Sequence, residues 1–303
     1  MSIKTQFSIK DLEHLTGVKA HTIRIWEKRY KLLTPARTDT NIRQYDLLNL
    51  KKLLNITFLY NEGYKISKIA KFEAEEVHKL IGGLAETNKE SFAQQEFKKA
   101  MFDFDHHLFT RTFKQISKEK TFDEVFKTVF LPLLHEIGML WQTGTIDPSH
   151  ERFISELIKQ KIIVNICLLQ ETNPKNLGPV FALYLPAEEM HEIGLLYVNY
   201  EIIAAGFDTI YLGTNMPIES LRHIVKHHEE IIFVSYLTVK PDYESIHDYL
   251  DRFEKTLGTI NPVNLWIMGW KVQEINLEKL PPNVSPIQDF ITLDAKLADL
   301  KSS

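Results

Sequence analysis

The sequence of 303 residues predicts a multidomain protein made of a winged helix-turn-helix head, a four-helix bundle and a flavodoxin-like α/β doubly wound parallel sheet. Two short helical patterns meet at a glycine near the start. Apolar residues then recur at helical spacing through the middle. After Gly178, strand-like apolar runs alternate with helical stretches. From these changes of pattern we expect domains at residues 1–73, 74–175 and 176–303.

The composition is that of a globular chain, with 44% hydrophobic and 25% charged residues. The single cysteine, Cys167, excludes an internal disulfide framework and any CxxC zinc site. No apolar run has the length of a membrane span, and Met1 to Phe7 lacks the apolar stretch of a signal peptide. We therefore expect a cytoplasmic protein without membrane contact.

Charge is distributed unevenly along the chain. Residues 1–72 hold 14 Lys and Arg against 6 Asp and Glu, whereas the remainder holds 22 against 34. A basic head on an acidic body indicates that the head faces a polyanion, which charge alone does not identify as DNA or as an acidic partner. The alternative is an ordinary solvated basic face.

The first helical pattern begins after Ser8, a residue type that caps helix N-termini, and ends at Gly17. A second helix is expected from about Ala20 to Arg29, with Ile23 and Trp26 on one side. Two short helices joined by a glycine turn are typical of a helix-turn-helix, whose second helix fits the major groove of DNA.

A polar segment after Pro35 is expected to form a two-stranded wing. Asn41 tolerates the left-handed conformation that a tight turn requires, and Arg37 and Arg43 flank it as candidate phosphate contacts. A further helix, from about Asp46 to Tyr60, would complete a small core.

The string from Val18 to Thr38, followed by Arg43-Gln44-Tyr45, resembles the winged-helix DNA-binding domain of the mercury-resistance regulator (MerR) family. The resemblance covers about residues 6–73, and Asn41 stands where that family usually has glycine. It implies that the partner is a double-stranded DNA operator. The candidate contact residues are Thr22, Arg24, Lys28, Arg37, Arg43 and Tyr45.

Residues 73–172 read as helices. Apolar residues follow the i, i+3, i+4 rule from Phe122 to Ile137, and Asp147-Pro148 offers a cap with proline in the first turn of the next helix. Classical MerR regulators continue with one long coiled-coil helix, but no sustained heptad pattern is present here. The middle is therefore predicted to be a bundle of about four helices.

Strand candidates in the third segment lie at 180–185, 209–212, 231–235 and 265–268. Their alternation with helical stretches is the βαβ rhythm of a parallel sheet, which binds ligands at the carboxyl ends of its strands. Those ends carry the run from Glu189 to Gly194, then Ser235-Tyr236-Leu237, and then Gly269-Trp270.

This loop pattern resembles the cobalamin-binding domain of methionine synthase and its relatives, over about residues 178–301. The resemblance implies that His191 is the lower cobalt ligand and that the carboxylate of Glu189 orients its imidazole. It also makes Gly194, Ser235, Leu237 and Gly269 cofactor-binding candidates. Trp270 replaces a second glycine of the pattern, and its indole would block the cleft for the nucleotide tail unless it points outward.

The string from Gly138 to Ile146 looks like the bundle that caps the upper face of cobalamin in the light-sensing CarH/LitR group of regulators. The resemblance implies that Trp141 and Glu151 adjoin the upper ligand of adenosylcobalamin. That group has histidine where this chain has Arg152. His150 is not its equivalent, because positions 150 and 152 of a helix point about 200° apart.

Together these resemblances imply a transcriptional regulator that binds DNA under the control of cobalamin, with adenosylcobalamin as the expected form and light as a possible signal. They also imply a homo-oligomer, either a dimer or a tetramer. Two alternatives remain open. A corrinoid methyltransferase or mutase subunit would need a further catalytic domain, so we expect no enzyme activity. A regulator could instead have lost the cofactor and kept its body for oligomerisation, as Arg152 and Trp270 would allow.

Overall fold

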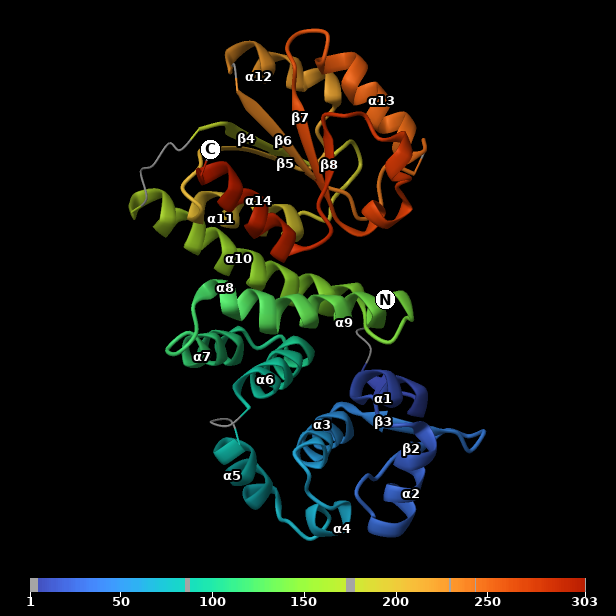
Figure 1. Cartoon of the computed structure of the whole chain (residues 1–303). Coiled ribbons are helices and arrows are strands. Elements are labelled where there is room, and N and C mark those ends of the chain that lie inside the picture. Colours follow the sequence, from blue (N-terminus) through green and yellow to red (C-terminus); the bar gives the residue numbers. More distant parts are fainter. Residues whose placement is uncertain (1–4, 85–87, 173–177, 229, 243, 303) are drawn as a thin grey trace. The chain divides into compact units, whose positions relative to one another are not determined.

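The computed structural model describes residues 5–84, 88–172, 178–228, 230–242 and 244–302. The chain forms two compact units, Met1–Ile158 (unit 1) and Lys159–Ser303 (unit 2), whose boundary falls inside a long helix. The predicted domain boundary at 175/176 lies outside the described residues. Figure 1 labels the elements of both units.

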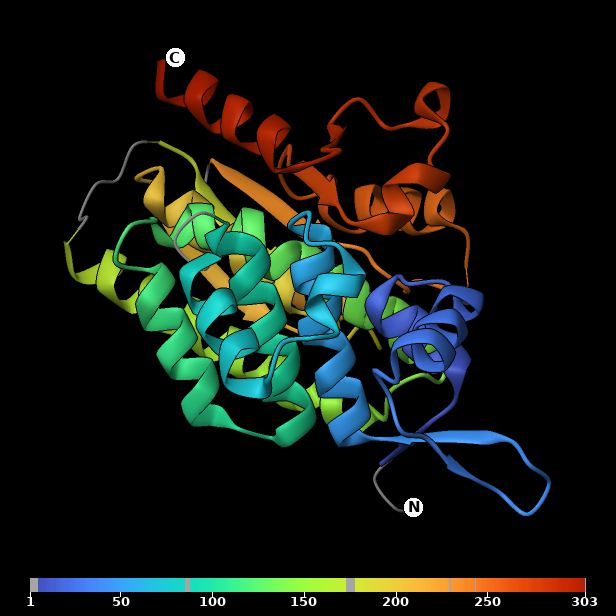
Figure 2. The same ribbon diagram turned by 90° about the horizontal axis from the view of Figure 1, so that it is seen from below.

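Unit 1 begins with the predicted winged helix-turn-helix. Strand β3 (Arg43–Asp46) pairs antiparallel with β1 (Gln6–Phe7) on one side and with β2 (Ala36–Arg37) on the other. The helices of the head are α1 (Ile9–Thr16), α2 (Ala20–Tyr30), α3 (Leu47–Asn61), α4 (Ile66–Ile69) and α5 (Ala74–Leu84). In Figures 1 and 2 the hairpin of β2 and β3 extends away from the helices of the head.

Local chemistry explains where the head helices begin and end. Ser8 caps α1 in a reciprocal capping box with Asp11, and such a cap stabilises the folded head by about 1 kcal/mol. Gly17 ends α1 at a φ of 72°, a conformation that costs glycine nothing. Asp46 caps α3 by accepting from the backbone N–H of Asn49. The predicted caps and helix positions of the head are confirmed.

The bundle of unit 1 consists of α6 (Lys89–Asp103), α7 (His106–Ile116), a continuous helical stretch and the start of α10 (Pro148–Thr172). The continuous stretch joins α8 (Phe122–Val125), a π-helical turn (Phe126–Phe130) and α9 (Leu131–Gln142). Its core is aromatic: the ring of Phe130 lies 5.3 Å from that of Phe97 and 5.9 Å from that of Phe113. The helical middle is confirmed, and α10 begins at the predicted Pro148.

Head and bundle pack on one another within unit 1. The ring of Phe7 meets that of Phe102 edge to face at 5.8 Å, and Lys51 pairs with Asp103 at 2.5 Å. The loop after α9 is also tied to α1, because Nδ1 of His14 lies 3.0 Å from Oγ1 of the buried Thr145.

Unit 2 contains a five-stranded parallel sheet in the order β5-β4-β6-β7-β8. Its strands are β4 (Val180–Tyr184), β5 (Thr209–Gly213), β6 (Ile231–Tyr236), β7 (Asn264–Met268) and β8 (Val284–Pro286). The chain leaves β4 first toward β5 and later toward β6, so the topological switch point lies between β4 and β6. The predicted doubly wound sheet is confirmed, and β8 is a strand that the sequence pattern did not reveal.

Helices cover both faces of this sheet (Figure 1). The 3-10 turn η2 (Ile218–Leu221), α12 (Arg222–His227) and α13 (Ile246–Leu257) pack on one face. Helices α11 (Ile193–Ala204) and α14 (Phe290–Ser302) lie on the other, where Lys296 of α14 stands over the ring of Trp266. Two further 3-10 turns, η3 (Trp270–Glu274) and η4 (Leu277–Lys279), connect β7 to β8. Among the described residues, no helix is long and apolar enough to span a membrane.

Candidate functional site

The second helix of the head presents a polar surface. Ile23 and Trp26 of α2 are buried in the head core, which leaves Arg24 and Lys28 exposed and Thr22 half-buried on the remaining faces. This division follows from the helical period, because positions 24 and 28 lie away from the buried pair, whereas position 22 lies one turn before Trp26 on the same side. Arg24 and Lys28 are therefore available to a ligand of the head, and Thr22 is partly covered.

The wing carries a second set of cations. Arg37 is exposed at the end of β2, and its guanidinium donates to Oδ1 of Asn41 at 2.5 Å. Asn41 has a φ of 62°, which is the left-handed conformation expected at the wing turn. The contact orients Arg37 along the hairpin while its other donors remain available.

Two of the predicted contact residues are held by a carboxylate of α2. Nε of Arg43 donates to Glu27 at 2.9 Å, and the hydroxyl of Tyr45 donates to the same carboxylate at 2.8 Å. Tyr45 is completely buried, and this burial, together with the hydrogen bond to Glu27, raises the pKa of its phenol. Its expected direct contact with DNA does not fit this position. Tyr45 instead fixes the wing against α2, through Glu27, a residue that the sequence analysis did not single out.

The candidate residues of the bundle lie near the junction of α9 and α10. Trp141 is 49% exposed at the end of α9, and Glu151 in the first turn of α10 accepts from Oγ of Ser155 at 2.8 Å. His150 is only 2% exposed, and its ring stacks on that of Phe104 at 5.0 Å. Arg152 is exposed. Positions 150 and 152 therefore point in different directions, as the helical angle requires.

His191 lies in the loop between β4 and α11, with its side chain 56% exposed. Its Nδ1 lies 2.5 Å from Oε1 of Glu189, whose side chain is completely buried. Burial alone would raise the pKa of Glu189, but hydrogen bonds from His191 and from backbone N–H groups outweigh it and lower the pKa to about 2. An ionised carboxylate only accepts, so Nδ1 carries the proton, and in the neutral imidazole the lone pair is on Nε2.

Glu189 is itself held by six hydrogen bonds. Oε1 accepts from the backbone N–H groups of Met190 and His191 as well as from the imidazole. Oε2 accepts from three consecutive backbone N–H groups, those of Thr238, Val239 and Lys240, in the loop after β6. Sequence reasoning missed this loop, because backbone N–H groups are common to nearly all residue types. The loop joins the ends of β4 and β6 through one buried charge.

The remaining candidates of unit 2 line the same edge of the sheet. Ser235 is completely buried and donates to the carbonyl of Tyr184 at 2.9 Å, and Leu237 is also completely buried. Gly269 has a φ of 98°, and a Cβ there would lie 2.5 Å from the carbonyl oxygen of Leu237. Trp270 is 60% exposed, so its indole points outward. Glycine is required at 269 by the neighbouring backbone.

Gly194 lies in the first turn of α11. A Cβ at this position would lie 2.6 Å from two ring atoms of Tyr236, so only glycine allows the ring to pack there. We expected Gly194 to let the backbone run close to a nucleotide tail. In the structure it lets the backbone run close to Tyr236. The bulky Tyr236 between Ser235 and Leu237 was the feature of the sequence that could have predicted this contact, and the sequence analysis passed over it.

The donor set of this edge fits a metal that carries its own macrocycle and needs one axial ligand. An imidazole in a fixed tautomer, oriented by a buried carboxylate, is the arrangement by which proteins present histidine to a metal. In cobalamin, the protein histidine would take the position of the cofactor's own base. The side chains of unit 2 thus include a suitable lower ligand for cobalt.

Comparison with known families agrees with this division of the chain. Residues 7–76 match the MerR HTH family of regulatory proteins, and residues 93–164, which run from within α6 to within α10, match the B12 binding domain. The chain therefore joins a MerR-type helix-turn-helix to a B12-binding module.

The chain is homologous to two transcriptional repressors of Myxococcus xanthus. It is 27% identical over 288 residues to the HTH-type transcriptional repressor CarH, a match that covers 87% of this chain and 88% of that protein. It is 22% identical over 240 residues to the HTH-type transcriptional repressor CarA, covering 78% of each. The solved monomethylamine corrinoid protein of Methanosarcina barkeri shares the fold, with a TM-score of 0.56 and 14% identity over 71% of this chain and 100% of that chain.

Proposed function

We propose that this protein is a DNA-binding transcriptional regulator whose body binds cobalamin, with His191 as the lower cobalt ligand. The observation that carries the proposal is the hydrogen bond from His191 to Glu189, because it fixes the imidazole in the tautomer that a metal requires. The homology to CarH and CarA, which are named as repressors, supports the regulatory role. We further propose that it is not an enzyme and that it acts in the cytoplasm.

The head would supply affinity for a double-stranded operator. Arg24 and Lys28 on α2 would enter the major groove, while Arg37 on the wing would contact phosphate. We propose that the chain acts as a dimer or tetramer, because a symmetric oligomer engages a pseudo-palindromic operator at several heads at once. Cofactor binding that favours one oligomer would then change operator affinity.

In the body, we propose that residues 176–303 hold the lower face of the cofactor and that the bundle of residues 74–175 covers its upper face. Adenosylcobalamin, when bound, would supply a cobalt–carbon bond that light can break. Trp141 and Glu151 would adjoin the upper ligand. Arg152 has no lone pair to offer a metal, and His150 is buried against Phe104.

The test is an absorption spectrum of the full chain. The protein is incubated with adenosylcobalamin in the dark, desalted, and measured before and after illumination. We expect retained cofactor with the spectrum of cobalt held by a histidine, and we expect His191→Ala to lose most of the cofactor or to retain it without imidazole coordination. As a matched control, His223→Ala, which changes an exposed histidine of α12 in the same unit, should retain the cofactor. Equal spectra and affinity in the parent and His191→Ala would contradict the proposal.

A body without cofactor is the second candidate, and the ring of Tyr236 against Gly194 is the observation that favours it. Such a body would serve oligomerisation only. The same desalting experiment separates the two candidates, since a cofactor-free regulator retains no cobalamin but still binds its operator.

A further inference from the structure

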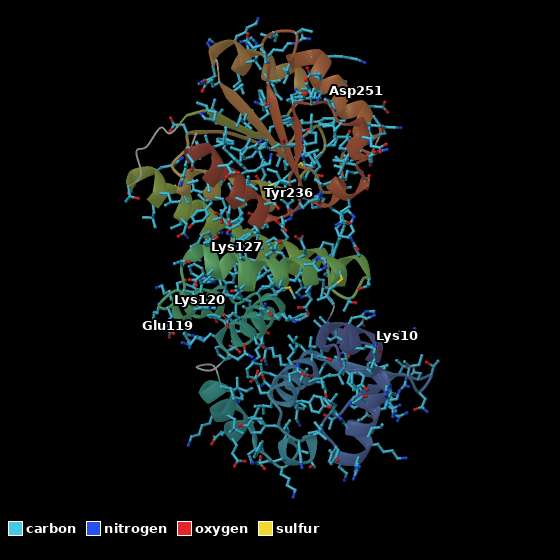
Figure 3. All side chains as sticks on the ribbon, in the orientation of Figure 1. Lys10, Glu119, Lys120, Lys127, Tyr236 and Asp251 are labelled. Atoms are coloured by element: carbon cyan, nitrogen blue, oxygen red, sulfur yellow. The ribbon has the colours of Figure 1, made fainter. Side chains whose placement is uncertain are left out.

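Tyr236 lies at the point of unit 2 where a parallel sheet receives its ligand. It is the last residue of β6, and β6 adjoins β4 at the topological switch point. Figure 3 shows Tyr236 at the carboxyl-terminal end of the sheet. An extended ligand group that enters the sheet of this fold class does so between these two strand ends.

The ring of Tyr236 lies between the ends of β4 and β6, on the face of the sheet that α11 covers. Successive residues of a strand face opposite sides, and Phe233, which shares its face with Ser235, packs on Phe253 of α13. The ring therefore faces α11, where Cε1 and Cζ would lie 2.6 Å from a Cβ at position 194. Burial raises the pKa of the Tyr236 phenol, and the side chain as a whole is half-buried.

The position matters because His191 lies only three residues before Gly194. If His191 takes the lower position on cobalt, the base that cobalamin carries on its nucleotide tether is displaced from the metal. The tether begins at the corrin ring, so the displaced base must be accommodated beside the same loop. The nearest entry into the fold is the switch point, and the ring of Tyr236 is already there.

We propose that Tyr236 is a specificity-determining residue that selects among corrinoids. With the ring in place, the site accepts a corrinoid that lacks the lower nucleotide, such as cobinamide, more readily than complete cobalamin. Binding of cobalamin requires the ring to leave its packed position on Gly194, and the fraction of molecules in which it has left scales the observed affinity. This inference rests on the proposed function of His191.

The expected effect follows from the cost of moving a half-buried aromatic side chain. Because the side chain of Tyr236 is half-buried, moving its ring into water reduces the competent fraction by roughly tenfold. Tyr236→Ala should therefore bind cobalamin roughly tenfold or more tightly than the parent, whereas cobinamide affinity should change little. Tyr236→Phe keeps the ring and should behave as the parent does.

The experiment measures the dissociation constants of cobalamin and cobinamide for the full chain by absorption titration. It compares the parent, Tyr236→Ala, Tyr236→Phe and His191→Ala. Tyr236→Val serves as a second ring-free variant that suits a strand, in case the alanine variant does not fold. A rise in the preference for cobalamin over cobinamide in the ring-free variants, but not in Tyr236→Phe, supports the inference.

The two proposals fail in different ways. If both corrinoids bind, depend on His191, and keep the same preference with and without the ring, the selection by Tyr236 is wrong and the proposed function stands. If neither corrinoid binds the parent or the ring-free variants, both proposals are wrong. If Tyr236→Phe changes the preference as much as Tyr236→Ala does, the hydroxyl and not the ring is responsible, and the inference is overturned.

Discussion

Replacing Glu189 by glutamine removes the buried charge that joins the ends of β4 and β6. The pKa of Glu189 falls from 4.5 to about 2 on folding, which corresponds to about 3 kcal/mol of stabilisation at neutral pH. The neutral amide would also turn an NH2 group toward backbone N–H donors such as that of Val239. We therefore expect Glu189→Gln to destabilise unit 2 by about 3 kcal/mol at pH 7.

The lowered pKa of Glu189 also sets how the stability of unit 2 depends on pH. Because the folded value lies below the unfolded one, the stabilisation is fully present above about pH 5 and is lost as the pH falls through 4.5 toward 2. The parent should lose this increment of stability in that window. Glu189→Gln, which has no charge to lose there, should show a smaller loss.

Hydrogen exchange of the full chain across a urea gradient, read on peptides of β6, measures the stability of unit 2 separately from unit 1. Glu188→Gln is the matched control, since the side chain of Glu188 is 67% exposed and pairs only at the surface with Lys240. We expect the control to change stability by less than about 0.5 kcal/mol. A Glu189→Gln protein as stable as the control at pH 7 would refute this reasoning.

Three further predictions concern other parts of the chain. Arg37→Ala should weaken binding to all DNA sequences similarly and reduce the slope of log affinity against log salt by about one. The control Arg222→Ala, at an exposed arginine of unit 2, should change neither quantity. An unchanged slope in Arg37→Ala removes Arg37 from the interface. After illumination, the parent protein loaded with adenosylcobalamin should lack the spectrum of cobalt held by two histidines, and Arg152→His should show that spectrum. The two-histidine spectrum in the parent would show that another histidine reaches the cobalt. Gly194→Ala should destabilise unit 2 by about 1 to 3 kcal/mol in urea unfolding, and Tyr236→Ala should relieve most of that cost; two independent, additive effects would contradict the contact.

The sequence by itself determined most of the helices and strands, although not β8. Ser8 and Gly17 define the ends of α1 because caps and left-handed turns depend on one or two neighbouring residues. The alternation of apolar runs and helical stretches after Gly178 defined the parallel sheet for the same local reason. The resemblance of the loop from Glu189 to Gly194 to a cobalamin-binding domain implied the contact between His191 and Glu189, and the structure contains that contact.

The tertiary structure alone decided what surrounds those residues. Tyr45 is bound to Glu27, 18 positions away, and Glu189 is held by backbone groups 49 to 51 positions away. Whether Trp270 or Tyr236 faces the protein interior depends on the strands and helices packed around it, and the indole is exposed whereas the phenol ring lies on Gly194. Local patterns do not encode such pairings, because burial and close contact depend on which distant segments the completed fold brings together.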